Sequence, residues 1–192
     1  MNRILLAYAL VLIVLGLYGA YLWQGFLKRG AKRAVYMGSA LHYLIPILKK
    51  IIEEHIGNQT GHYTFLELGA GHALVTRRMA KWYVWKNSIA VEISSLIASL
   101  AKINIFLSPY RSSVKVLRAD LLNYKIENPA VLYCYINSSL LDILYKQGKL
   151  VDCLLISLSF TIPNCQPDYV YPMGNWQGNV YVYDFRNSTL KE

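Results

Sequence analysis

Charged residues are scarce in this chain, and acids are the scarcer kind. Charged residues make up 16% of the 192 residues and hydrophobic residues 55%, with 11 acids against 20 Lys and Arg. This composition is too apolar for a wholly soluble protein. The formal net charge of +9 suits an anionic membrane surface. No basic-aromatic interleaving or RNA-binding signature is present, so we expect no nucleic-acid partner.

Cysteine is also scarce, and the three present, Cys134, Cys153 and Cys165, form no C-x-x-C pair. The sequence therefore supports neither a zinc site nor a redox motif, and we predict no metal centre. Two of the three fall in very apolar runs, where a free cysteine behaves as a small buried hydrophobe.

Charge is missing altogether from residues 4–26, which would form a helix about 34 Å long, enough to cross a hydrocarbon core of about 30 Å. A signal-peptide core is shorter, about 7–15 residues, and ends at a small-x-small cleavage site. This run ends instead in Tyr21, Trp23 and Phe26, aromatics typical of a membrane interface. We predict an uncleaved transmembrane anchor in residues 1–33, with a cleaved signal or a buried helix as the alternatives.

The flanks of this run predict its orientation. Arg3 stands alone before it, whereas four cations follow directly: Lys28, Arg29, Lys32 and Arg33. The positive-inside rule places the rest of the chain on the cytoplasmic side, or the matrix side of a mitochondrion.

Beyond residue 34 the chain alternates between two hydrophobic periods. An amphipathic helix spans about 41–52, with Pro46 where it begins or bends. We then predict strands at 63–68, 88–91, 114–117, 130–136 and 151–158, and helices at 72–85, 95–107 and 138–146. This alternation predicts a doubly wound, mostly parallel α/β sheet in a domain of residues 34–192. Two strands at 168–171 and 180–185, with no helix between them, predict a C-terminal antiparallel hairpin.

A glycine loop joins the first predicted strand to the following helix: Glu67-Leu68-Gly69-Ala70-Gly71. Glycines let the backbone turn sharply and approach a ligand near the free N–H groups of a helix N-terminus. Glu92 ends the second strand, where an acid can accept both ribose hydroxyls of a nucleoside. Asp120 follows the third strand, where a polar side chain can reach an adenine amino group.

Two nucleoside cofactors compete for such a loop. A nicotinamide dinucleotide requires G-x-G-x-x-G, but Leu74 occupies the place of the last glycine. Glu67 would repel a phosphate and would suit a cationic ligand instead. We therefore favour S-adenosylmethionine over a dinucleotide.

These motifs resemble class I S-adenosylmethionine-dependent methyltransferases, from about residue 35 to the end. More narrowly, they resemble the small archaeal and mitochondrial-type protein-lysine methyltransferases, whose animal relatives carry an N-terminal membrane segment and modify mitochondrial membrane proteins. The shared features are ELGAG opening a helix, AVEIS, the stretch 132–144, and the ending GNVYVY at 178–183. The chain departs from that subgroup at His72-Ala73, where an acid and a glycine are usual. The resemblance assigns the donor contacts to these positions: Glu67, Gly69, Ala70, Gly71, His72, Glu92, Ile93, Asp120 and Leu121.

The acceptor side is predicted at the end of the fourth strand, where Tyr135 and Asn137 lie. Asn137 can orient an amine through its carbonyl, and Tyr135 can hold a cation against its ring. The alternative is structural: Asn137 as a helix N-cap and Tyr135 as a core aromatic. The Asn-Pro-Pro-Tyr signature of enzymes that methylate planar nitrogens is absent.

The sequence predicts a membrane-anchored methyltransferase acting on lysine of a membrane-associated protein. Two rivals stay open: a methyltransferase of a small lipophile such as a quinone or lipid, and a catalytically inert membrane-bound module of the same fold.

Overall fold

The structure is a computed structural model that describes residues 12–14, 16, 41–174 and 178–186. The chain divides into two compact units, residues 1–37 and residues 38–192. The predicted anchor, residues 4–26, lies outside the described residues except for 12–14 and 16, which are helical. In the described part of the chain, no helix has the length and apolar character needed to span a membrane.

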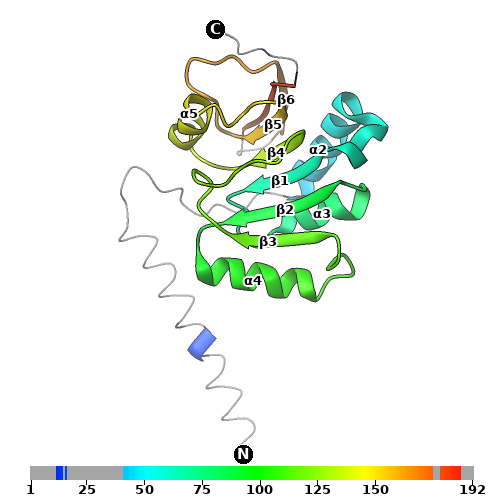
Figure 1. Cartoon of the computed structure of the whole chain (residues 1–192), viewed down its shortest axis with the longest axis vertical. Coiled ribbons are helices and arrows are strands. Elements are labelled where there is room, and N and C mark those ends of the chain that lie inside the picture. Colours follow the sequence, from blue (N-terminus) through cyan, green and yellow to red (C-terminus); the bar gives the residue numbers. More distant parts are fainter. Residues whose placement is uncertain (1–11, 15, 17–40, 175–177, 187–192) are drawn as a thin grey trace, which may run out of the picture. The chain divides into compact units, whose positions relative to one another are not determined.

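A seven-stranded sheet forms the centre of the second unit (Figure 1), with the order β3-β2-β1-β4-β5-β7-β6. Strands β1 to β5 pair in parallel, and β7 is antiparallel to both β5 and β6. This confirms the predicted parallel sheet and its C-terminal hairpin. The strands are β1 Thr64–Leu68, β2 Asn87–Glu92, β3 Val114–Arg118, β4 Ala130–Cys134, β5 Cys153–Leu158, β6 Tyr169–Pro172 and β7 Asn179–Asp184.

Helices cover both faces of the sheet. The described helices are α2 Leu41–His55, α3 Leu74–Trp82, α4 Ser95–Phe106 and α5 Ser138–Lys146, with a 3-10 turn, η1, at Gly57–His62. Neighbouring residues of a strand point to opposite faces. Phe65 of β1 accordingly packs with α2 and α3, whereas Leu66 packs with α5. Strands buried on both sides explain the nearly continuous apolar runs.

The chain changes direction across the sheet after β3. It passes from β1 outward to β2 and β3, and then returns to place β4 on the other side of β1. Ligands of open α/β sheets bind outside the carboxyl ends of the strands at such a reversal. The strand order therefore predicts a ligand site at the loops that follow β1 and β4.

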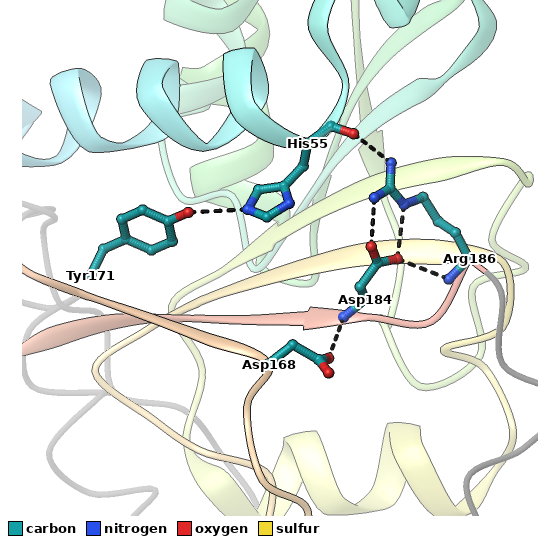
Figure 2. Close-up of polar contacts among 5 residues, drawn as sticks. All are labelled: His55, Asp168, Tyr171, Asp184 and Arg186. Atoms are coloured by element: carbon teal, nitrogen blue, oxygen red, sulfur yellow. Dashed lines mark hydrogen bonds and ion pairs between the residues drawn. The ribbon is translucent and has the colours of Figure 1, made fainter.

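A polar cluster fastens the hairpin to the end of α2 (Figure 2). Arg186 forms an ion pair with Asp184 and donates through Nη1 to the His55 carbonyl at 2.7 Å. His55 Nε2 lies 3.0 Å from the Tyr171 hydroxyl, and the Asp184 amide donates to the Asp168 carboxylate at 2.8 Å. Asp184 pairs with Leu154 near the start of β5. The Arg186–Asp184 pair thus lies at the opposite end of the parallel strands from the loops that follow β1 and β4.

Candidate functional site

The loop after β1 folds back over the end of β2. The amides of Gly69 and Ala70 both donate to the Val91 carbonyl, at 3.0 and 2.9 Å. Gly69 has a φ of 71° and Gly71 a φ of 54°, in the left-handed region that side chains disfavour. The conformation of the loop therefore favours glycine at both positions.

Gly69 also lies against the loop that follows β4. A Cβ atom placed on Gly69 would be 3.2 Å from Cγ2 of Ile136, which is tighter than an ordinary van der Waals contact. The loops after β1 and β4 therefore approach each other closely at the reversal of strand order. A side chain at position 69 would therefore have to displace Ile136 or move the loop.

The two residues that depart from the resembled subgroup lie at the end of this loop. Ala73 is fully buried and has a φ of 56°, a conformation that favours glycine and explains why glycine is usual there. His72 is half-buried, and its carbonyl accepts from Nδ2 of Asn104 on α4 at 3.0 Å. This bond ties the loop to α4, a contact that the sequence did not reveal.

Glu92 connects the glycine loop to the turn after β2. Its Oε2 accepts from the Gly71 amide and its Oε1 from the Ser94 amide, both at 2.9 Å. The carboxylate is therefore held in one orientation by two backbone donors. Since each carboxylate oxygen has a second lone pair, Glu92 can still accept two further hydrogen bonds, as the hydroxyls of a ribose would require.

Glu67 is buried and turned toward the first turn of α3. Its Oε2 accepts from the Thr76 amide at 2.8 Å and from the Thr76 hydroxyl at 2.5 Å. Burial is the main cause that raises the pKa of Glu67 to about 7. The hydrogen bonds from Thr76 lower this pKa, and the negative charge of Glu92 raises it. A carboxylate beside a helix N-terminus is favourably placed in the helix dipole. Glu67 thus holds the first turn of α3, and it ionises near neutral pH rather than in the acidic range.

This perturbed carboxyl predicts a pH effect on stability. In the unfolded chain Glu67 would titrate near its ordinary pKa of 4.5, so the folded state binds the proton more tightly. Stability is then greatest below that pH and falls as the pH rises from about 4.5 to about 7, by about 3 kcal/mol from this group. Glu67→Gln keeps an oxygen for Thr76 and cannot ionise, so we expect this loss to be absent in the variant. Urea unfolding of both proteins across this pH range measures the difference, and parallel curves would contradict the assignment.

The side of the site near β2 and β3 contains the remaining predicted donor contacts. The Ala119 amide donates to the Glu92 carbonyl at 3.1 Å, which holds the end of β3 beside Glu92. Asp120 Oδ1 accepts from the Leu122 amide at 2.9 Å, and Leu121 is half-buried. Ile93 is 63% exposed although it directly follows Glu92. An exposed apolar side chain beside Glu92, the acid predicted to bind a ribose, is suited to pack on a purine ring.

The predicted acceptor residues lie after β4. Asn137 is the N-cap of α5, and its Oδ1 accepts from the Leu140 amide at 2.9 Å, so the structural alternative for this side chain is realised. Tyr135 is half-buried, and its ring centroid lies 5.9 Å from that of Phe160, which follows β5. The sequence did not single out Phe160, because the pairing depends on β4 and β5 being neighbours in the sheet.

Two of the three cysteines are buried in the core. Burial raises the pKa of Cys134 to about 12, so its thiol is not a nucleophile at neutral pH. Cys153 is also buried, as the sequence predicted. Among residues 41–174 and 178–186, no group of three or more His, Cys, Asp or Glu side chains is arranged to hold a metal ion.

Solved structures of other proteins share this fold, although no protein-family model and no curated protein matches the chain. An RNA methyltransferase from Salinibacter ruber, in complex with S-adenosyl-L-homocysteine, has a TM-score of 0.63 at 16% identity, covering 77% of this chain and 95% of its own. The N-terminal domain of human METTL16, also in complex with S-adenosylhomocysteine, has a TM-score of 0.56 at 11% identity, with 78% and 72% covered. The ribosomal protein L11 methylase from Lactobacillus delbrueckii subsp. bulgaricus has a TM-score of 0.54 at 15% identity, with 73% and 78% covered. The chain is similar to these proteins in its class I methyltransferase fold.

Proposed function

We propose that this protein is an S-adenosylmethionine-dependent methyltransferase. The observation that carries the proposal is Glu92, whose carboxylate is fixed by the amides of Gly71 and Ser94 at the carboxyl end of β2. Together with the left-handed Gly69 beside Ile136, it forms a nucleoside-binding edge at the reversal of strand order. S-adenosylhomocysteine, the demethylated donor, occupies two of the similar structures. The donor supplies an electrophilic methyl group, and the protein supplies proximity and alignment.

For the acceptor, we propose a lysine side chain of a membrane-associated protein. The resemblance of ELGAG, AVEIS and the final GNVYVY to small protein-lysine methyltransferases supports this class. The Tyr135–Phe160 pair offers aromatic faces that attract an ammonium group. The apolar run at residues 4–26, with the cations that follow it, supports an anchor that holds the enzyme near membrane proteins on the cytoplasmic or matrix side. An anchor raises the effective concentration of such partners without any added contact.

RNA is the second candidate acceptor. The Salinibacter ruber protein is an RNA methyltransferase, and the same aromatic pair could stack on an unpaired base. The formal charge of +9 would also favour a polyanion. The absence of Asn-Pro-Pro-Tyr after β4 disfavours planar nitrogens as acceptors, and for this reason we place lysine first.

A single labelling experiment separates the candidates. The protein is incubated with labelled S-adenosylmethionine and solubilised native membranes that retain their bound RNA. Label in a protein band, converted to methyl-lysine on hydrolysis, supports the proposal. Label in the RNA or in the lipid extract assigns the corresponding acceptor instead, and absence of label despite donor binding supports an inert module.

Asn137 permits a test that separates capping from catalysis. Asn137→Ala removes the N-cap of α5, which should cost about 1 kcal/mol of stability. Asn137→Ser restores a capping oxygen without the amide group. We therefore expect the Ser variant to regain stability but to remain slow in methyl transfer, with its donor affinity unchanged. Recovery of both properties in the Ser variant would reduce Asn137 to a cap.

A further inference from the structure

Helix α4 has apolar side chains on its outer face as well as on its inner face. On the inner face, Ala101 and Ile105 pack with Val114 and Val116 of β3. The outer face carries large apolar side chains that are between 41% and 76% exposed: Leu96, Leu100, Ile103, Phe106 and Leu107. Their spacing of three and four residues makes one stripe, about 16 Å long at about 1.5 Å per residue. A surface helix normally presents polar residues outward, so this stripe is a candidate interaction site.

The charges within the segment that carries this stripe are all of one sign. From Ile93 to Ala119 the chain contains four cations and no acid. Lys102 lies in α4, Arg111 in the connection to β3, and Lys115 and Arg118 on β3, and all four residues are exposed. Because β3 is the edge strand and α4 lies alongside it, this segment forms one border of the domain (Figure 1).

We propose that this border, the α4 stripe with its neighbouring cations, rests on an anionic lipid surface. Helices that lie in a membrane interface combine an apolar face with flanking Lys and Arg. The apolar stripe would enter the boundary between headgroups and acyl chains, and the cations would be attracted by the negative surface potential. The contact would orient the domain on the bilayer, which an anchor alone cannot do.

Two other occupants match the surface less well. A second copy of the chain meeting it about a two-fold axis would bring the same patch against itself. That arrangement would place the four cations opposite four more, with no acid in the segment to neutralise them. Nucleic acid would satisfy the cations, but protein–nucleic acid interfaces are more polar than this aliphatic stripe.

The test uses the full chain, with Cys165→Ser, reconstituted into lipid vesicles. A spin label is attached at Ile103→Cys on the stripe, and in a separate protein at Lys146→Cys on α5, where the native side chain is 71% exposed. The measurement is the accessibility of each label to dissolved oxygen, which concentrates in lipid, and to a water-soluble nickel chelate. Vesicles of equal parts phosphatidylcholine and phosphatidylglycerol are compared with vesicles of phosphatidylcholine alone.

In anionic vesicles we expect an oxygen-to-nickel ratio several-fold higher at Ile103 than at Lys146. The ratio should fall toward the Lys146 value in neutral vesicles, and also in anionic vesicles when Lys102 and Arg111 are both changed to Glu. A label at Leu100, one turn away, should repeat the result if the label at Ile103 disturbs the helix. Equal ratios at Ile103 and Lys146 would overturn the proposal, since the stripe would then face water. Exclusion of both reagents would also overturn it, because a protein surface would then cover the stripe.

Discussion

Glu92→Gln is expected to weaken binding of S-adenosylmethionine by about tenfold to a hundredfold, although the two side chains have nearly the same shape. The reason is that both carboxylate oxygens accept a backbone amide, one from Gly71 and one from Ser94. A glutamine must turn its NH2 group toward one of these donors, which leaves that amide without an acceptor. It also loses charge-assisted acceptance from the ribose. Glu92→Ala removes both acceptors, and its loss should be larger still. Titration calorimetry with the donor measures each affinity.

Asp142→Asn is the matched control for the lost charge. Asp142 pairs with Lys146 on the exposed side of α5, so the variant removes one negative charge and one ion pair away from the glycine loop. Surface pairs of this kind contribute about 0.3–0.5 kcal/mol or less, so donor affinity should be unchanged. Equal affinities for wild type, Glu92→Gln and Asp142→Asn would show that Glu92 does not contact the donor.

The sheet could be predicted from the sequence because its strands are buried on both faces. Runs such as 130–136 and 151–158 are short and almost entirely apolar, without an alternating polar face. Such runs predict a parallel strand that is covered on both faces. Helix α5 was predicted with its observed bounds, because Asn137 caps its start and Gly148, with a φ of 64°, follows its end. The antiparallel hairpin could also be predicted, because the segment between β6 and β7 is too short for a crossover helix.

The side-chain partners within the site could not be predicted in this way. The period of a strand shows that Glu67 points to one face of the sheet, but not that Thr76 lies there to receive it. Phe160 meets Tyr135 only because β4 and β5 are neighbours. The sequence shows that Ala73 departs from the usual glycine, but not that its backbone is left-handed. Each of these contacts depends on strand order and loop conformation rather than on local pattern.

The fold also leaves the acceptor undetermined. An RNA methyltransferase and a ribosomal protein methylase both share this fold, with TM-scores of 0.63 and 0.54 and sequence identities of 16% and 15%. What they share with this chain is the fold, whereas acceptors are recognised by loops and surfaces placed on that frame. For this reason the proposal for lysine depends on the residues after β4 and β5 and on the final hairpin.

Gly69→Val is expected to abolish measurable donor binding and to destabilise the domain by a few kcal/mol. Two effects combine at this position. A valine would have to adopt a φ near 71°, which costs at least about 1–2 kcal/mol for a residue with a Cβ. Its Cβ would also be 3.2 Å from Cγ2 of Ile136, with two further methyl groups to place in a packed region. Either the loop after β1 moves away from β4 or Ile136 is displaced, and both changes disturb the loop to which we assign donor binding.

Gly148→Val separates these two effects. Gly148 has a similar φ of 64°, but a Cβ there would meet no atom within 4 Å. We therefore expect the Gly148 variant to show the conformational cost alone, with donor affinity at the wild-type level. Gly69→Ala should cost less stability in an Ile136→Ala background than in the wild type, by the part due to the contact and by none of the part due to φ, while Ile136→Ala has its own cost because Ile136 is buried. Urea unfolding of the four combinations gives the coupling energy between positions 69 and 136. A coupling of zero would mean that the loops after β1 and β4 do not touch, and the close approach that shapes the donor site would then be wrong.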